Sequence, residues 1–245
     1  MKPIKIGNKK IGRDHECYII AEIGSNFDGS LTKAKKLIRL AKDCGADAAK
    51  FQSFKTELLL SKKGFESKSA FQSKWKKSVW NTYKEAEFPR MWHKILNDYA
   101  KKIDIDFFTS PWDFEAVDLL CKLNVPAIKI GSGDITYLDF LEYVGKTKKP
   151  ILLATGASNM KEVEMAVKTI KSTGNNKIIL MHSVVQYPSP IEEANLKSIE
   201  TLMGKFSLNV GYSDHSLGTL IPYASVFLGA SVIEKHFTLD KNSIG

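Results

Sequence analysis

Long apolar runs and paired cysteines are both absent from this 245-residue sequence. No apolar stretch approaches the roughly 20 residues needed to span a bilayer, and the N-terminus has no signal-peptide pattern. The three cysteines are widely spaced and have no zinc-ligand spacing, so we expect reduced core thiols and a cytoplasmic protein. These absences argue against a membrane protein and a disulfide-rich secreted domain.

Nucleic-acid-binding motifs are also lacking, although the formal net charge is +9. The lysines are spread along the chain, apart from a local concentration between residues 62 and 77. This distribution is more typical of a solvated basic surface than of a nucleic-acid interface. We therefore expect small-molecule partners rather than nucleic acid or membrane, and keep binding to anionic polymers as an alternative.

What the sequence does contain is a regular alternation of short β-rich runs and amphipathic helices. Such alternation is typical of βα units around a parallel sheet. The expected strands span residues 18–23, 48–52, 106–110, 127–131, 151–154, 177–182, 208–211 and 231–236. Eight strands are the number that a closed barrel needs, and the chain length suits one domain. We predict an α/β fold, a single (β/α)8 TIM barrel over residues 1–245.

Caps and periodicity locate several helices and connections. Ser30 is expected to cap a helix that Gly45 ends, and Ser158 to cap another that Gly174 ends. Residues 114–123 and 216–228 read as further helices, the second so apolar that we expect deeper burial. Residues 1–12 are predicted to form a hairpin closing the barrel floor, and 54–89 a lid. No final helix follows the eighth predicted strand.

Two lysines stand in otherwise apolar strand runs, which is unusual because lysine is seldom buried unless paired. Lys50 and Lys129 are both predicted near the carboxyl ends of strands, where barrel enzymes place catalysis. They are expected to act as clamps for phosphate and carboxylate groups, or else as structural ion pairs with a carboxylate. The candidate carboxylates are Glu22, Asp134 and Glu234.

Two histidines end adjacent predicted strands. His215 and His236 are therefore expected to approach one divalent metal ion, with water or substrate filling the open positions. The alternative is a pair of packed core histidines. The carboxylates named above would serve as acid, base or support for the metal ligands.

The order of the motifs resembles the sialic acid synthase family, which makes N-acetylneuraminate and related nonulosonates. The most specific matching segments are Gly-Tyr-Ser-Asp-His-Ser at 211–216 and Ile-Glu-Lys-His-Phe-Thr-Leu-Asp at 233–240. The others are Ala-Glu-Ile-Gly-Ser-Asn at 21–26, Ala-Lys-Phe-Gln at 49–52, Phe-Phe-Thr-Ser-Pro-Trp-Asp at 107–113, Ile-Lys-Ile-Gly-Ser-Gly-Asp at 128–134, Leu-Ala-Thr-Gly at 153–156, Met-His-Ser at 181–183 and Tyr-Pro-Ser-Pro at 187–190.

The resemblance implies a phosphoenolpyruvate-dependent condensation with an N-acetylated amino sugar such as N-acetylmannosamine, giving a sialic acid and phosphate. It implies that His215 and His236 hold Mn2+ or Mg2+ and take part in catalysis with Glu22 and Asp134. The substrate-binding residues that it implies are Lys50, Gln52, Ser110, Lys129, Ser132, Thr155, Tyr187, Ser213 and Glu234.

The sequence departs from the family pattern at several places. Val185 stands where an Asn or Ser is usual, and Ala154 where a Ser is frequent. The family usually adds a final helix and an antifreeze-like C-terminal domain that reaches the partner subunit, which implies a possible homodimer and a possible separate C-terminal domain. Two alternatives remain: a synthase acting on a phosphorylated sugar, and a catalytically impaired barrel that binds anionic ligands.

Overall fold

Eight parallel strands form the centre of the molecule in the computed structural model, which describes residues 1–59, 63 and 76–241. The strands are hydrogen-bonded in the order β5-β4-β3-β10-β9-β8-β7-β6, and β5 and β6 contact each other at the remaining edge. The sheet is therefore a nearly closed barrel, as predicted. The strands are β3 (Tyr18–Gly24), β4 (Ala48–Ser53), β5 (Asp106–Pro111), β6 (Ile128–Ile130), β7 (Ile151–Ala154), β8 (Ile178–Ser183), β9 (Asn209–Asp214) and β10 (Val232–His236).

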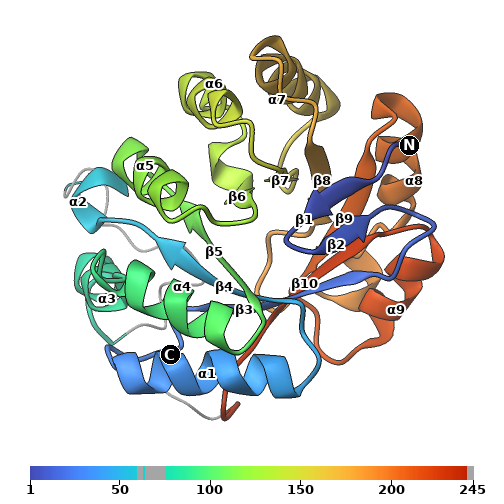
Figure 1. The fold of residues 1–245 in the computed structure, drawn as a ribbon. Helices are drawn as coiled ribbons and strands as arrows, with labels where there is room; N and C mark the ends of the chain where they lie inside the picture. Colours follow the sequence, from blue (N-terminus) through green and yellow to red (C-terminus); the bar gives the residue numbers. More distant parts are fainter. Residues whose placement is uncertain (60–62, 64–75, 242–245) are drawn as a thin grey trace.

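Helices surround the barrel on the outside (Figure 1). They are α1 (Leu31–Asp43), α2 (Thr56–Leu59), α3 (Val79–Ala86), α4 (Trp92–Lys102), α5 (Phe114–Lys122), α6 (Leu138–Lys146), α7 (Met160–Ser172), α8 (Lys197–Phe206) and α9 (Leu220–Phe227). Helix α1 shows why they form, because Ser30 accepts a hydrogen bond from the Lys33 amide and the apolar residues share one buried face. The predicted cap and helix are confirmed there.

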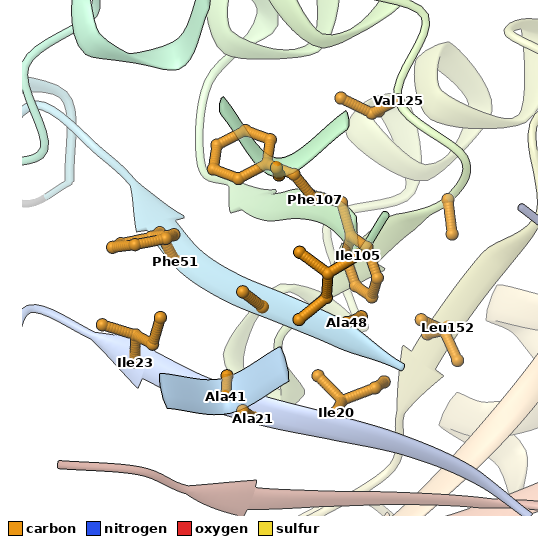
Figure 2. Packing of buried hydrophobic residues seen from close by; sticks show 14 of the residues in the cluster. Ile20, Ala21, Ile23, Ala41, Ala48, Phe51, Ile105, Phe107, Val125 and Leu152 are labelled. Carbon is orange, nitrogen blue, oxygen red and sulfur yellow. The ribbon is translucent and has the colours of Figure 1, made fainter. Parts of the chain in front are cut away.

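The hydrophobic core fills the barrel and the layer between strands and helices. Figure 2 shows part of one cluster, in which Ile20 and Ala48 of neighbouring strands lie with Leu152 of β7. Phe51 of β4 packs against Phe27 and Phe88 instead, with ring centroids 6.2 Å and 4.8 Å away. Because successive strand residues point to opposite faces, one strand fills both layers.

The N-terminal hairpin is present as predicted. Strands β1 (Ile4–Ile6) and β2 (Lys9–Ile11) pair antiparallel, and Ile6 and Ile11 are fully buried in the barrel core cluster. The Asn209 side-chain amide, at the first residue of β9, donates to the Lys2 carbonyl at 3.0 Å. The hairpin therefore packs at the amino ends of the strands, the barrel floor.

Three local predictions are wrong. Asn159, not Ser158, caps α7, because Asn159 and Glu162 form a reciprocal capping box. Helix α9 buries only Ile221 and Ser225, so its apolar composition does not reflect deep burial. The cysteines are free but are not core residues, since Cys44 is exposed and the other two are half-buried.

Part of the predicted lid lies outside the described residues, namely 60–62 and 64–75. Its described remainder contains the short helices α2 and α3. Residues 242–245 are also outside the description, and between β10 and residue 241 no helix is formed. In the described part of the chain no helix is both long and apolar enough to cross a membrane.

The turn of the hairpin gives the first prediction. Gly7 has a φ of +54°, and a Cβ at this position would overlap the Asp106 carboxylate at the start of β5. Gly7→Ala should lower the free energy of unfolding by about 3 kcal/mol, from backbone strain and displacement of Asp106. Gly29→Ala is the matched control, because Gly29 has a φ of +67° with no atom within 4 Å of a Cβ. Gly29→Ala should lower the free energy of unfolding, measured in urea, by about 1 kcal/mol. Equal losses in Gly7→Ala and Gly29→Ala would contradict this account.

Candidate active site

A buried network of four charged side chains lies inside the barrel at the carboxyl ends of the strands. Lys50 Nζ lies 2.6 Å from Glu22 Oε2 and 3.8 Å from Glu234 Oε2, and Lys129 Nζ donates to Glu234 Oε1 at 3.0 Å. Strands β6 and β10 are not neighbours in the sheet, so the Lys129–Glu234 contact crosses the barrel interior. We call these four residues the ion network.

Strand periodicity explains why these charges meet. Glu22 follows Ile20 at a spacing of two in β3, and Lys50 follows Ala48 in the same way in β4. Residues spaced by two share a face, so an apolar inner layer is followed toward the mouth by a charged one. All four charged residues of the network are at most 5% exposed.

The network shifts the pKa values of its members. Burial alone would raise the pKa of Glu234, but Lys129 and Lys50 outweigh it and lower that pKa to about 2. Burial lowers the pKa of Lys129, and the neighbouring Lys50 charge adds to this despite Glu234. Burial likewise opposes the charge of Lys50, but Glu22 and Glu234 reverse this and raise its pKa. The positive charges of Lys129 and Lys50 therefore keep Glu234 ionised although it is buried in the barrel.

The network's remaining hydrogen bonds come from neighbouring strands. Ser213 donates to Glu234 at 3.0 Å, Gln52 donates to Glu22 at 2.9 Å, and Lys50 donates to Ser110 at 3.3 Å. Among the described residues, no hydrogen-bond donor is aligned on Glu22 Oε2 or Glu234 Oε2, although Lys50 contacts both. Buried acceptors are normally satisfied, so these two oxygens are suited to interact with a ligand or water.

A small polar cradle adjoins the network at the ends of β6 and β7. The Gly156 amide donates to Ser132 Oγ at 3.1 Å, and Ser132 Oγ lies 3.4 Å from Ser183 Oγ. A Cβ on Gly156 would come within 2.8 Å of Ser132 Oγ and 2.6 Å of Ser183 Oγ, so only glycine fits. Thr155 is buried beside it. Hydroxyl groups and a backbone amide gathered in this way suit an anionic oxygen.

The two predicted metal ligands also lie side by side. The rings of His215 and His236 have centroids 5.6 Å apart, and the Tyr187 ring lies 4.1 Å from that of His215. His215 Nδ1 lies 2.8 Å from the Val184 carbonyl, which fixes the ring and leaves Nε2 for another partner. Burial lowers the pKa of His215, so the ring is neutral near pH 7, the form that binds a metal.

A second ion pair, between the buried Asp214 and the partly exposed Lys235, supports the segment that carries His215. Lys235 pairs with Asp214, which is 1% exposed, and donates to the Ser216 carbonyl at 2.8 Å. Asp214 also accepts hydrogen bonds from the Ser216 amide and hydroxyl. The pair therefore holds the segment that carries His215 against the strand that carries His236.

Asp134 lies apart from the ion network, in the 3-10 turn Ser132–Asp134 after β6. Burial raises its pKa from 3.8 to about 6. Of the two explanations for the buried lysines, the predicted ion pairs with Glu22 and Glu234 are present, whereas Asp134 forms no ion pair within the described part of the chain. The clamp role of the lysines stays a prediction.

The predicted site residues thus converge on one end of the barrel, but not all in one contact network. Ser183 joins the cradle although its strand-end position alone gave no reason to select it. Gly24, where the register between β3 and β4 shifts, was also missed: a Cβ there would come within 3.4 Å of Glu22 Oε1. Only a register irregularity, which sequence does not display, marks that position.

Comparisons with known proteins agree with this geometry. A model of the NeuB family matches residues 37–245. The chain is 45% identical over 232 residues to N,N'-diacetyllegionaminic acid synthase of Campylobacter jejuni, covering 93% of this chain and 69% of that protein. It is 37% identical to the human N-acetylneuraminate-9-phosphate synthase, covering 94% of this chain and 64% of that protein.

Among solved structures, the chain is similar to the N-acetylneuraminic acid synthetase of Leptospira borgpetersenii in complex with citrate. The TM-score is 0.89 at 35% identity, and the match covers 98% of this chain and 79% of that chain. A truncated 3-deoxy-D-arabino-heptulosonate 7-phosphate synthase of Thermotoga maritima, with a TM-score of 0.73 and 17% identity, shares the fold. The chain therefore spans about two thirds to four fifths of these relatives.

The raised pKa of Asp134 gives a stability prediction. The folded chain binds this proton more tightly than the unfolded chain, so the free energy of unfolding should fall as pH rises from about 4 through 6. Asp134→Asn cannot ionise and so avoids that loss. As the pH rises from 5 to 7.5, the free energy of unfolding of Asp134→Asn should rise relative to that of wild type by up to about 2 kcal/mol. Urea unfolding at both pH values measures it. Asp139→Asn, on exposed α6 surface, is the control; the same pH-dependent gain there would sink the assignment.

Proposed function

The chain belongs to the NeuB family, and we propose that its barrel condenses phosphoenolpyruvate with an N-acetylated amino sugar to give a nonulosonic acid and phosphate. In this reaction C3 of phosphoenolpyruvate bonds to the aldehyde carbon of the open-chain sugar. Water adds at C2, and the phosphate leaves with cleavage of its C–O bond. The observation that carries the proposal is the buried ion network beside paired histidines at the strand ends.

The ion network and the cradle suit the anionic substrate. Phosphoenolpyruvate carries a phosphate and a carboxylate, and Lys50 and Lys129 are the two buried cations at this end of the described barrel. In the adjacent cradle the Ser132 hydroxyl offers a donor to phosphate oxygens, and the Gly156 amide holds that hydroxyl in place by donating to its Oγ. We infer that binding shifts part of the lysines' hydrogen bonding from Glu22 and Glu234 to the substrate.

The histidines and their neighbours suit a divalent metal, Mn2+ or Mg2+. His215 and His236 fit this role because their rings are close and His215 is held through Nδ1. No group of three His, Cys, Asp or Glu side chains in the described ranges is arranged for a metal, so water and substrate would complete the coordination. A bound ion would act as a Lewis acid on the aldehyde oxygen.

The carboxylates Asp134 and Glu22 are the candidates for proton transfer. Asp134, with its pKa raised to about 6, can accept or return a proton near neutral pH. Glu22 lies within the network, where Gln52 donates to its Oε1 and the Lys50 ammonium group lies 2.6 Å from its Oε2. We therefore assign Asp134 to acid–base work and Glu22 to orienting the reacting groups.

A second candidate acceptor is a phosphorylated amino sugar. The specific observation is the similarity to the human N-acetylneuraminate-9-phosphate synthase, whose name states a phosphorylated product. At 37% identity this relative is more distant than the Campylobacter jejuni synthase at 45%. The unphosphorylated acceptor is therefore the first choice.

The proposal predicts phosphate release that needs three components together. With phosphoenolpyruvate and Mn2+, the chain should release phosphate with N-acetylmannosamine or a 2,4-diacetamido sugar, and less with N-acetylmannosamine 6-phosphate. Lys129→Met should lower the rate at least about 100-fold, because it removes a donor to developing negative charge. Lys161→Met, an exposed lysine on α7, should leave it unchanged.

The readout separates the proposal from its alternatives. Faster release with the 6-phosphate would favour the second acceptor. Calorimetric binding of phosphoenolpyruvate without phosphate release from any acceptor would identify a binding protein and reject the proposed reaction.

A further inference from the structure

A second cavity lies at the opposite end of the barrel from the candidate active site. It has a volume of about 1060 Å3 and is lined by the hairpin, the start of β5 at Asp106 and the start of β9 at Asn209. By strand register, Asp106 lies two residues before Phe108, the partner of Lys50, and Asn209 lies four residues before Ser213, the partner of Glu234, so roughly 7 to 13 Å of strand separates the cavity from the ion network. The proposed reaction does not use this cavity.

The charges around this floor cavity are strongly unbalanced. Asp106 is the one carboxylate among its described lining residues, and it accepts a hydrogen bond from the Tyr18 hydroxyl at 2.6 Å. Asp47 and Asp104, which line a neighbouring cavity, are paired with Lys9 and Lys42. Against this single carboxylate stand six lysines: Lys2, Lys5, Lys101, Lys148, Lys149 and Lys177.

Three of the lysines are fixed in the cavity wall by backbone carbonyls rather than by carboxylates. Lys149 donates to the Val125 carbonyl and to the Asn124 side chain, both at 2.9 Å. Lys177 donates to the Lys148 carbonyl at 3.1 Å, and Lys148 donates to the Thr173 carbonyl. An ammonium group has three donors, so each keeps donor capacity. Burial lowers the pKa of Lys149, and the charge of Lys177 adds a smaller lowering.

The other three lysines, Lys2, Lys5 and Lys101, have no ion-pair partner among the described residues. They come from the hairpin and from α4, whereas Lys148, Lys149 and Lys177 come from the loops after α6 and α7. Cations from four separate segments therefore face one concave volume of the size that binds small ligands. Lysines gathered around one cavity create a stronger local positive potential than the same number of lysines spread over a surface.

We propose that this floor cavity binds a small, multiply phosphorylated anion. Lysine ammonium groups act as point charges for phosphate, and six of them around one volume favour a ligand with several phosphate charges. No described residue of the lining is aromatic, so the cavity lacks the stacking surface typical of single-stranded nucleic-acid sites. Because the lysines come from separate segments, the anion would also tie the hairpin to the barrel and raise its thermal stability.

Titration calorimetry with sodium triphosphate tests the proposal, at 150 mM KCl with the whole chain. ATP and fructose 1,6-bisphosphate as parallel titrants distinguish a nucleotide from a sugar phosphate as the source of the phosphate groups. Wild type should bind triphosphate, and Lys5→Gln/Lys101→Gln should weaken binding at least about tenfold, equal to about 1.4 kcal/mol. The rise in melting temperature on adding triphosphate should shrink in parallel.

The matched control removes the same charge elsewhere. Lys36→Gln/Lys168→Gln takes two exposed lysines from the outer faces of α1 and α7, and should leave triphosphate affinity within twofold of wild type. Equal weakening in both double variants would show diffuse attraction to net charge and overturn the proposal. Unchanged affinity in Lys5→Gln/Lys101→Gln, or no binding by wild type, would do the same. These outcomes are independent of phosphate release at the other end of the barrel.

Discussion

The contact between Lys129 and Glu234 across the barrel interior is the constraint on which the rest of the site depends. It joins strands that are not neighbours, so it fixes how the two sides of the barrel meet as well as which charges are buried. Glu234 in turn holds Ser213 and lies near Lys50, which binds Glu22. Burying either partner alone would be costly, so each residue of the ion network stabilises the charge of the others.

This arrangement gives the two ends of the barrel different chemistry. At the carboxyl ends of the strands, opposite charges are balanced and leave two carboxylate oxygens without an aligned donor among the described residues. At the floor, lysines outnumber carboxylates and are held by backbone carbonyls. The first end suits exchange of partners during a reaction, and the second suits retention of an anion.

The strand pattern and the site positions could be predicted because both follow from local rules. Each predicted strand overlaps an observed one, and the parity of β3 and β4 places Glu22 and Lys50 on the inner face. Ion pairing of the buried lysines was one of the two predicted explanations, but which carboxylate each lysine would take could not be chosen from the sequence, because the Lys129–Glu234 contact joins residues 105 positions apart. The exposure of α9 was mispredicted because an apolar composition does not reveal which neighbours cover a helix. The cap of α7 went to Asn159 because Glu162 completes its capping box.

A double-mutant cycle on Lys129 and Glu234 tests most directly whether the ion network acts as one unit. Lys129→Met and Glu234→Gln should each lower the free energy of unfolding by about 3 kcal/mol, since each removes the nearest opposite charge from a buried partner. The double variant should lose at least about 1 kcal/mol less than the sum. Losses that add to within about 0.5 kcal/mol would contradict the account, because the two charges would then be independent.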